Sequence, residues 1–202
     1  SKVLAAEALR DESARLGLDV VQVLPGWMFG PWDAAPTASG RFVLDFLGGR
    51  LPATRPAGMN AVDARDVAGG MTRPGERARP GDSYILGGPF TTLSDVANTL
   101  AQVTGIAAPR WRVPYGVAWA YAALAEAWAR FRDSDTLITV AAVRAMHAEL
   151  RVSSNKALRE LGWRYRSLAE ALRDEVEWYR AHGPAGQVGL AGSWAEPRVS
   201  IP

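Results

Sequence analysis

The 202-residue sequence contains no cysteine, two histidines and two lysines, Lys2 and Lys156. The absence of cysteine excludes disulfide bonds and thiolate metal ligands, and it suits a reducing compartment. His147 and His182 fall on different predicted helices, with no further ligand at metal-binding spacing. We therefore expect no metal site, and we expect the protein to be cytoplasmic.

The sequence also lacks a strong excess of charge of either sign. Its net charge is +2, and its many arginines are scattered among carboxylates. A nucleic-acid-binding surface would require clustered basic residues, so we expect no nucleic-acid partner. The chain opens on a charged, helix-forming segment, not on a basic stretch followed by an apolar one, so we expect no signal peptide.

Long hydrophobic runs are missing as well. Residues 115–131 are rich in alanine and aromatic residues, but they include Glu126 and Arg130. This run is shorter than the roughly 20 apolar residues that span a bilayer, so we predict a buried or interfacial helix and expect no membrane contact. Its aromatic side chains could rest on a lipid surface or line an apolar pocket, but their helical spacing is more typical of a core. They include Trp119, Tyr121 and Trp128.

The first part of the chain alternates helix and strand. Residues 2–16 form a predicted helix that ends at Gly17, and the β-branched run 19–24 predicts a buried parallel strand. A helix that leads into such a strand is typical of a doubly wound α/β sheet. Pro25 and Gly26 end the strand, and we expect residues 27–33 to form a loop at its carboxyl end, where ligands bind in such sheets.

Further elements follow from cap residues and periodicity. We predict strands at 60–62, 83–88 and 110–114, and helices at 41–47, from 67 onward, at 92–103, 115–131, 140–150, 154–161 and 168–181. The predicted N-caps are Ser39 or Thr37, Asp66, Thr92 or Ser94, and Ser167, which forms a capping box with Glu170. The segment from residue 184 onward has the composition of a mobile tail.

Lys2 lies at the start of the first predicted helix. A lysine four residues after a tyrosine shares its helix face, where its charge lowers the phenol pKa and makes the tyrosine a useful proton carrier. The matching tyrosine would be the third residue upstream of Ser1, so the given sequence does not complete the pair. A solvated lysine at a ragged terminus is the alternative.

An ordered series of residues resembles one enzyme family, the extended short-chain dehydrogenase/reductases of the NAD-dependent epimerase/dehydratase type. The nearest branch is that of dihydroflavonol-reductase-like proteins and hopanoid-associated sugar epimerases. The resemblance covers about residues 1–183. It rests on Pro25, Gly30-Pro31, Asp33, Pro36-Thr37, Gly40-Arg41, Asp45-Phe46-Leu47, Gly49-Arg50, Gly58, Asn60, Asp66-Val67-Ala68, Tyr84 to Gly88, Ser154, Lys156-Ala157 and Glu160 to Trp163.

The resemblance implies an α/β fold: the C-terminal part of a Rossmann-type doubly wound sheet with a small, mainly helical substrate domain. Residues 1–72 would be the remnant of the Rossmann-type domain, 73–183 the substrate domain with interleaved elements, and 184–202 a flexible tail. No Gly-x-Gly-x-x-Gly phosphate-binding turn occurs in the chain, so we expect a truncated chain or an N-terminal half supplied by a partner. Such a truncated sheet would expose an unpaired edge and apolar surface.

The same resemblance implies NAD or NADP as cofactor and a small-molecule substrate. Lys2 would be catalytic and would also hold the nicotinamide ribose. Pro25, Gly26, Trp27 and Met28 would lie against the nicotinamide. Arg41, Arg50 and Asn60 would contact an anionic or polyhydroxylated substrate, because guanidinium groups offer several directed donors. The first helix corresponds to one that often packs between subunits, so a homo-oligomer is one expected state.

Some positions depart from the family pattern. Gly26 and Trp27 stand where relatives tend to have small hydroxyl residues, and Asp63 and Arg65 replace an expected His and Asp. The leading hypothesis is the C-terminal half of an NAD(P)-dependent epimerase, dehydratase or reductase, acting by hydride transfer on a sugar nucleotide or a hydroxy or keto compound. This chain alone would be inactive. The alternative is a catalytically inactive remnant that binds a ligand or a protein.

Overall fold

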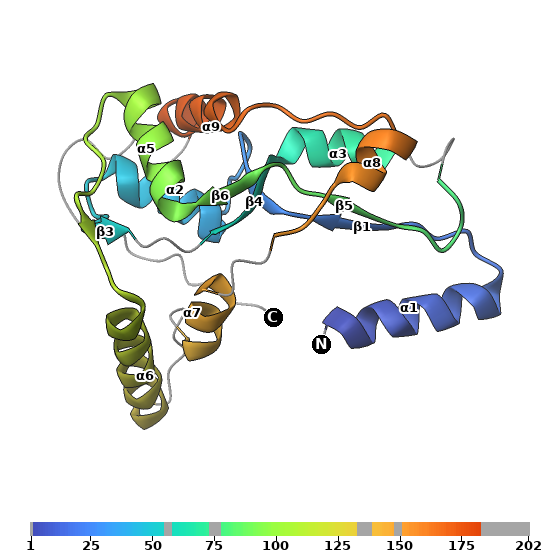
Figure 1. Ribbon diagram of the computed structural model, residues 1–202, viewed down its shortest axis with the longest axis horizontal. Helices are drawn as coiled ribbons and strands as arrows, with labels where there is room; N and C mark the ends of the chain where they lie inside the picture. The colour runs from blue at the N-terminus through green and yellow to red at the C-terminus, as the bar shows by residue number, and fades with distance from the viewer. Residues whose placement is uncertain (1, 55–57, 73–77, 133–138, 148–150, 183–202) are drawn as a thin grey trace.

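The computed structural model describes residues 2–54, 58–72, 78–132, 139–147 and 151–182 (Figure 1). Its helices in these ranges are α1 (Lys2–Leu16), α2 (Ala38–Leu47), α3 (Ala64–Thr72), α5 (Leu93–Thr104), α6 (Tyr115–Phe131), α7 (Val140–His147), α8 (Asn155–Glu160) and α9 (Leu168–His182). Its strands there are β1 (Gln22–Pro25), β2 (Trp27–Phe29), β3 (Ala53–Thr54), β4 (Gly58–Asp63), β5 (Ser83–Leu86), β6 (Phe90–Thr92) and β7 (Trp111–Arg112).

Strands β1 and β2 follow one another with only Gly26 between them, and they pair with different neighbours. β1 lies parallel to β5, with Pro25 opposite Leu86, whereas β2 lies parallel to β4, with Trp27 opposite Ala61. The N–H of Gly26 donates to the carbonyl of Leu86 at 3.0 Å, so the hydrogen-bonding continues past the end of β1. β4 also pairs antiparallel with β6, and β3 pairs parallel with β7. Parallel strands joined by helices confirm the predicted α/β class.

Most of the described helices lie on one side of these strands (Figure 1). α2, α5 and α9 cover β2 and β4 and enclose one core cluster, in which Val43, Val96, Leu100 and Leu172 are completely buried. Burying a side chain of this size contributes roughly 1.5–3 kcal/mol relative to leaving it exposed. A second cluster lies under α3 and α8 against β4 and β5, and it is made of Val62, Val67, Tyr84, Leu86, Ala157, Leu161 and Trp163.

Helix α1 lies on the opposite side of the strands and projects from the body of the protein (Figure 1). Its apolar side chains Val3, Leu4, Leu9 and Leu16 are all exposed. In the described part of the chain, β1 pairs with β5 alone, so its second edge is unpaired. The exposed apolar surface and the unpaired edge that the sequence predicted are therefore both present.

Local capping signals determine several helix ends as predicted. Thr37 accepts the N–H of Gly40 at the start of α2. Thr92 and Asp95 form a reciprocal capping box at the start of α5, and Gly105 ends that helix with a φ of 77°. Ser167 and Glu170 form the predicted capping box of α9, with O–H to carboxylate at 2.7 Å.

Other expectations were wrong in detail. The strand predicted over 19–24 begins only at Gln22, and residues 27–29, predicted as loop, form β2. α3 begins at Ala64 rather than at residue 67, so Asp66 is not its cap. Asp63 caps it instead, because its carboxylate accepts the N–H of Arg65 at 2.7 Å. The division near residue 73, with interleaved elements, stays a prediction, and β5 pairs with β1 from the other side of it. The predicted tail lies outside the described residues.

Candidate functional site

Glycines allow three chain segments to converge at the carboxyl ends of β1 and β5. A Cβ atom on Gly26 would overlap the backbone oxygen of Asn60, and one on Gly88 would overlap that of Ala61. Only a residue without a side chain permits backbones to approach this closely. Gly26, directly after β1, and the Gly-Gly pair after β5 therefore bring β4 against the edge at which open α/β sheets bind ligands.

Asn60 fastens this edge to a distant part of the chain. Its side chain is buried, and its Nδ2 donates to the carbonyls of Gly88 at 2.6 Å and Val152 at 3.1 Å. Its Oδ1 accepts the N–H of Val152 at 3.0 Å. Ser154 adds a second link, because its Oγ accepts the N–H of Gly87 at 2.9 Å. The amide of Asn60 thus has a structural role here, and its contact with substrate stays a prediction.

The four residues predicted to lie against a nicotinamide divide between two environments. Trp27 packs into the core side of the strand, with its ring 4.6 Å from that of Phe29 and 6.2 Å from that of Phe42. Pro25, the last residue of β1, and Met28, the middle residue of β2, are both exposed. Of the four residues, a ligand could therefore reach Pro25, Met28 and the half-buried Gly26.

Lys2 is the first residue of α1, and its side chain is outside the described part of the structure. The helix that carries it is formed as predicted and ends at Gly17, whose φ of 65° is a left-handed conformation that favours glycine. The sequence also has a Gly-x-x-Gly repeat over 183–192, which lies outside the described residues.

The two predicted substrate arginines lie at opposite ends of α2. Arg41 lies in the first part of the helix, and Arg50 lies three residues beyond its last residue, Leu47. Arg50 pairs with Asp45 at 3.0 Å and donates to the carbonyl of Leu44. Arg41 is exposed and uses its Nε on the carbonyl of Pro36 at 3.3 Å. Arg41 therefore keeps more of its donors for a ligand than Arg50 does.

A charged cluster after β4 went unpredicted. Arg65 donates to Asp63 and to Asp174 at 2.6 Å each, and Arg166 pairs with Asp66 at 2.7 Å and with Asp63 at 3.4 Å. Burial alone would raise the pKa of Asp63, but the hydrogen bonds and charge of Arg65, with the charge of Arg166, outweigh it and hold that pKa low. The cluster ties α3 and α9 to β4. Asp63 and Arg65, the two positions expected to depart from the family pattern, thus pair with each other.

A buried carboxyl group lies at the end of β2. Glu175 on α9 is 1 % exposed, and its Oε2 accepts the N–H of Gly30 at 2.9 Å. Burial raises the pKa of Glu175 to about 8, and the nearby negative charges of Asp33 and Asp63 add to the effect. Tyr179, one turn further along α9, donates to Asp33 at 3.1 Å, and burial raises its pKa too. These contacts hold the loop after β2 onto α9.

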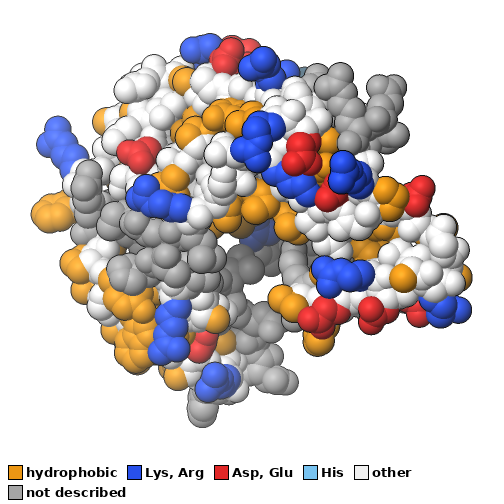
Figure 2. Space-filling model, turned by 45° about the vertical axis from the view of Figure 1, so that its right-hand side comes forward, with side chains coloured by type: hydrophobic (Ala, Val, Ile, Leu, Met, Phe, Trp, Pro, Cys, Tyr) orange, Lys and Arg blue, Asp and Glu red, His pale blue; other side chains and the backbone are white. Residues whose placement is uncertain are grey.

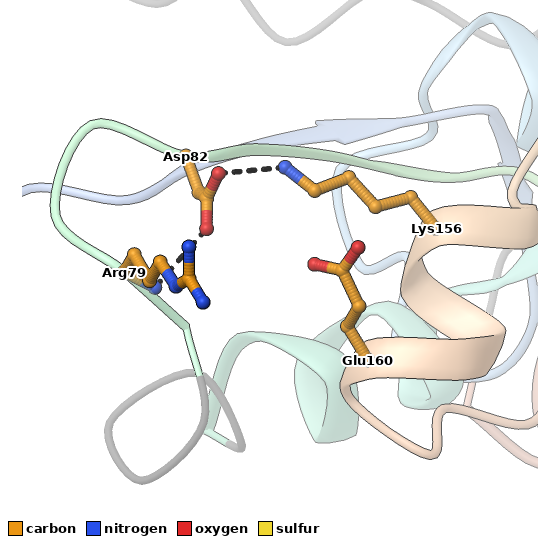
Figure 3. Close-up of a pocket in the computed structure, with 4 residues that line it drawn as sticks. All are labelled: Arg79, Asp82, Lys156 and Glu160. Atoms are coloured by element: carbon orange, nitrogen blue, oxygen red, sulfur yellow. Dashed lines mark hydrogen bonds and ion pairs between the residues drawn. The ribbon is translucent and has the colours of Figure 1, made fainter.

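A polar hollow of about 720 Å³ lies at the other end of β5 (Figure 3). It is lined by Arg79, Asp82, Lys156 and Glu160. Lys156 pairs with Asp82 at 2.7 Å, and the hydroxyl of Tyr84 donates to Glu160 at 3.0 Å. Asp82 precedes β5, so the hollow is at the amino end of the strand, away from the ligand-binding edge. Lys156 and Asp82 neutralise each other, and we assign the hollow no ligand.

Among the residues that the structure describes, no three His, Asp or Glu side chains are grouped so that they could hold a metal ion. Within those same ranges, no helix is both long enough and apolar enough to cross a bilayer.

Comparison with solved structures defines the class. The crystal structure of gox2253 matches with a TM-score of 0.74 and 32 % identity, over 89 % of this chain and 54 % of that one. A nucleoside-diphosphate-sugar epimerase from Pseudomonas aeruginosa matches with a TM-score of 0.72 and 28 % identity, over 90 % of this chain and 54 % of that one. The Bordetella bronchiseptica enzyme WbmF, solved in complex with NAD+, shares the fold, with a TM-score of 0.61 and 20 % identity over 90 % and 52 %. The fold is thus that of the C-terminal half of an epimerase or extended short-chain dehydrogenase/reductase.

Comparison with curated proteins narrows the resemblance. A putative dihydroflavonol 4-reductase from Synechocystis is 33 % identical over 85 % of this chain and 51 % of its own length. Sterol demethylase protein B from Methylococcus capsulatus is 31 % identical over 83 % of this chain and 52 % of its own length. No family model matches the sequence. The predicted resemblance to extended short-chain dehydrogenase/reductases, on the dihydroflavonol-reductase-like side, is confirmed. The chain spans about half the length of the curated relatives it matches.

Proposed function

We propose that this chain forms the substrate-binding half of an NAD(P)-dependent epimerase or reductase. The observation that carries the proposal is the 33 % identity to a dihydroflavonol 4-reductase-like protein over 85 % of the chain. The glycine-lined edge after β1 and β5 supports it, since this edge is where open α/β sheets bind ligands. An unpaired edge of β1 and an exposed α1 suit a chain whose sheet is completed by further strands.

The residues at this edge fit a flat, partly apolar ring. Pro25 and Met28 offer exposed apolar surface there, and the Gly26 backbone lies between them. Bound NAD or NADP would supply a hydride acceptor or donor at this place. Lys2 would hold a proton-carrying tyrosine of the complementary half in its reactive state, because a nearby ammonium lowers the phenol pKa.

The substrate class follows from the donors on α2. Arg41 is exposed, and its guanidinium can donate to a phosphate, a carboxylate or several hydroxyl groups. We propose Arg41 as the main substrate contact and Arg50 as a secondary one, because Arg50 is already paired with Asp45. A sugar nucleotide, or a hydroxy or keto compound carrying an acidic group, meets this requirement.

The experiment joins this chain to the missing half of the fold. The N-terminal half of the Pseudomonas aeruginosa epimerase is fused upstream of Ser1, and NADH and NADPH are titrated by fluorescence. We expect binding by the fusion, and we expect Lys2→Ala to weaken it at least tenfold with partial recovery in Lys2→Arg. Lys156→Ala is the matched control, since it removes the chain's other lysine from the far end of β5.

Two outcomes would contradict the proposal. If a folded fusion binds neither nucleotide, the chain is an inactive binding module and not half of an enzyme. If Lys2→Ala and Lys156→Ala affect binding equally, Lys2 has no role in the cofactor site. Circular dichroism of each variant separates loss of binding from loss of fold.

A further inference from the structure

Tyr179 on α9 reaches the start of α2, the helix that carries Arg41. Its side chain is completely buried, and its hydroxyl donates to Oδ2 of Asp33 at 3.1 Å. Burial raises the pKa of the Tyr179 phenol, so the hydroxyl keeps its proton at neutral pH and remains a donor. The two residues are 146 positions apart in the sequence, so this hydrogen bond ties α9 to the loop after β2.

Asp33 carries this contact into the first turn of α2. Its Oδ2 also accepts the N–H and the hydroxyl of Thr37, each at 2.9 Å. Thr37 is the N-cap of the helix, and its Oγ1 accepts the N–H of Gly40 at 3.4 Å. The carbonyl of Thr37 accepts the N–H of Arg41 at 2.8 Å. A continuous series of hydrogen bonds therefore joins the buried hydroxyl of Tyr179 to the backbone of Arg41.

Gly40, the residue before Arg41, lies directly against the same pair. A Cβ atom on Gly40 would overlap both the Tyr179 hydroxyl and the Asp33 carboxylate. Glycine inside a helix is destabilising relative to alanine, so its presence here needs a structural reason. The close approach of α2 to Tyr179 supplies that reason, because only a residue without a side chain allows it.

The loop between β2 and α2 is held firmly enough to keep a strained residue. Trp32 has a φ of 74°, a left-handed conformation that is unfavourable for any residue with a side chain. On one side of it Glu175 accepts the N–H of Gly30, and on the other side Tyr179 binds Asp33. Such strain persists only where surrounding contacts determine the backbone, so α9 fixes the conformation of this loop.

The side chain of Arg41 lies beside the loop that α9 holds. Its Nε donates to the carbonyl of Pro36 at 3.3 Å, and the residue is otherwise exposed. Arg50, beyond the other end of α2, pairs instead with Asp45 of the same helix. The contact with α9 is therefore made at the end of α2 where Arg41 lies.

We propose that Tyr179 is a positioning residue, which fixes the first turn of α2 through Asp33 and so directs Arg41 toward an anionic group of the substrate. This role rests on the proposed function, in which Arg41 is the main substrate contact. A guanidinium that is already placed loses less conformational freedom when it binds a phosphate or a carboxylate. Tyr179 acts from within the core, where a phenylalanine ring would fill the same space.

Amide hydrogen exchange tests whether Tyr179 holds the start of the helix. Exchange at Gly40 and Arg41 is followed by NMR in the full chain and in Tyr179→Phe, which removes only the hydroxyl. We expect at least tenfold faster exchange at these two amides and no change at Leu100, which is buried in α5. Asp33→Ala breaks the same contact from the loop side and should have at least as large an effect.

Calorimetric titration with UDP tests whether this positioning affects binding. UDP is the probe because its phosphates suit a guanidinium. We expect Arg41→Gln to weaken UDP binding at least tenfold and Tyr179→Phe to weaken it about fivefold. In the double variant Tyr179→Phe should add nothing, because it acts through Arg41. A purely structural role for Tyr179 would not depend on the residue at position 41.

Tyr121→Phe is the matched control, because it removes a hydroxyl from a tyrosine in solvent. The sequence favoured a core position for the aromatic residues of α6, and this expectation was wrong. Tyr121 and Trp128 are each 60 % exposed, and Trp119 is 39 % exposed. Figure 2 shows hydrophobic side chains gathered at the lower left, where α6 lies. Tyr121→Phe should change neither the exchange at Gly40 nor the affinity for UDP.

Unchanged exchange at Gly40 and Arg41 in Tyr179→Phe would overturn the positioning role. An equal increase at Leu100 would do the same, since it would mean a general loss of stability. Additive losses of UDP affinity in the double variant would show that Tyr179 does not act through Arg41.

Failure of the proposed function gives a different result. Full UDP affinity in Arg41→Gln, or no UDP binding by any form, would refute Arg41 as the substrate contact and the positioning role with it. The exchange rates at Gly40 and Arg41 need no ligand, so they would still show whether Tyr179 holds the helix.

Discussion

Replacing Glu175 by glutamine isolates the effect of one buried carboxyl group on stability. The pKa of Glu175 is raised from 4.5 to about 8, chiefly by burial. Between those two pH values the folded protein holds one proton more than the unfolded chain. The free energy of unfolding therefore falls by about 1.4 kcal/mol for each pH unit of increase. From pH 5.5 to 7.5 the protein should lose about 2.7 kcal/mol relative to the glutamine variant.

The sign follows from protonation. Below pH 4.5 the carboxyl group is neutral in both states and makes no difference, and above about pH 8 the full cost of burying its charge is present. Glutamine has nearly the same size and keeps an oxygen to accept the N–H of Gly30, so Glu175→Gln should be the more stable protein at neutral and alkaline pH. Glu177→Gln, an exposed change on the same helix, is the control.

Urea unfolding followed by tryptophan fluorescence at pH 5.5, 6.5 and 7.5 measures the difference. Other titrating groups contribute the same pH dependence in both proteins, so their contributions cancel in the difference between the two free energies of unfolding. Parallel stability curves for the protein and Glu175→Gln across this range would refute the reasoning, since they would mean that Glu175 has an ordinary pKa in the folded state. A widening gap that also occurs in Glu177→Gln would do the same.

Two further predictions concern the sheet edge and the charged cluster. Gly26→Ala should destabilise the protein by at least about 2 kcal/mol because its Cβ would overlap a backbone oxygen of β4. Gly69→Ala, in an open helix position, should stabilise it by up to about 1 kcal/mol, and equal melting temperatures would contradict this pair. Arg65→Gln should cost about 3 kcal/mol at pH 7 by leaving buried Asp63 without its main partner. The loss should fade as acid protonates Asp63, whose folded pKa is lowered, and exposed Arg50→Gln should cost under about 1 kcal/mol. A pH-independent loss in chemical denaturation would refute the charge argument.

Much of the fold was predictable because its signals are local. Thr92 with Asp95, Ser167 with Glu170, and Gly17 mark helix ends through bonds or backbone angles within a few residues. The family resemblance likewise depends on short, ordered motifs. These signals gave the element order and the class of fold before any contact was known.

The rest depends on partners far away in sequence. β2 is a strand only because β4 supplies its hydrogen bonds, and Arg166 reaches Asp63 from 103 residues further on. The same limit applies to α6, where helical spacing alone cannot say whether Tyr121 and Trp128 meet a core or solvent. The site at the end of β1 stays a prediction, and the different environments of Trp27 and Met28 depend on the packing of α2.

The hydrogen bonds of the Asn60 amide can form only late during translation. Its bonds to Val152 join residues 92 positions apart. A ribosome adding 5–20 residues per second needs roughly 5–20 s to make that stretch. During this interval β4 and the glycine segments beside it lack the hydrogen bonds from Val152, so this edge of the sheet is completed only after that residue has been synthesised.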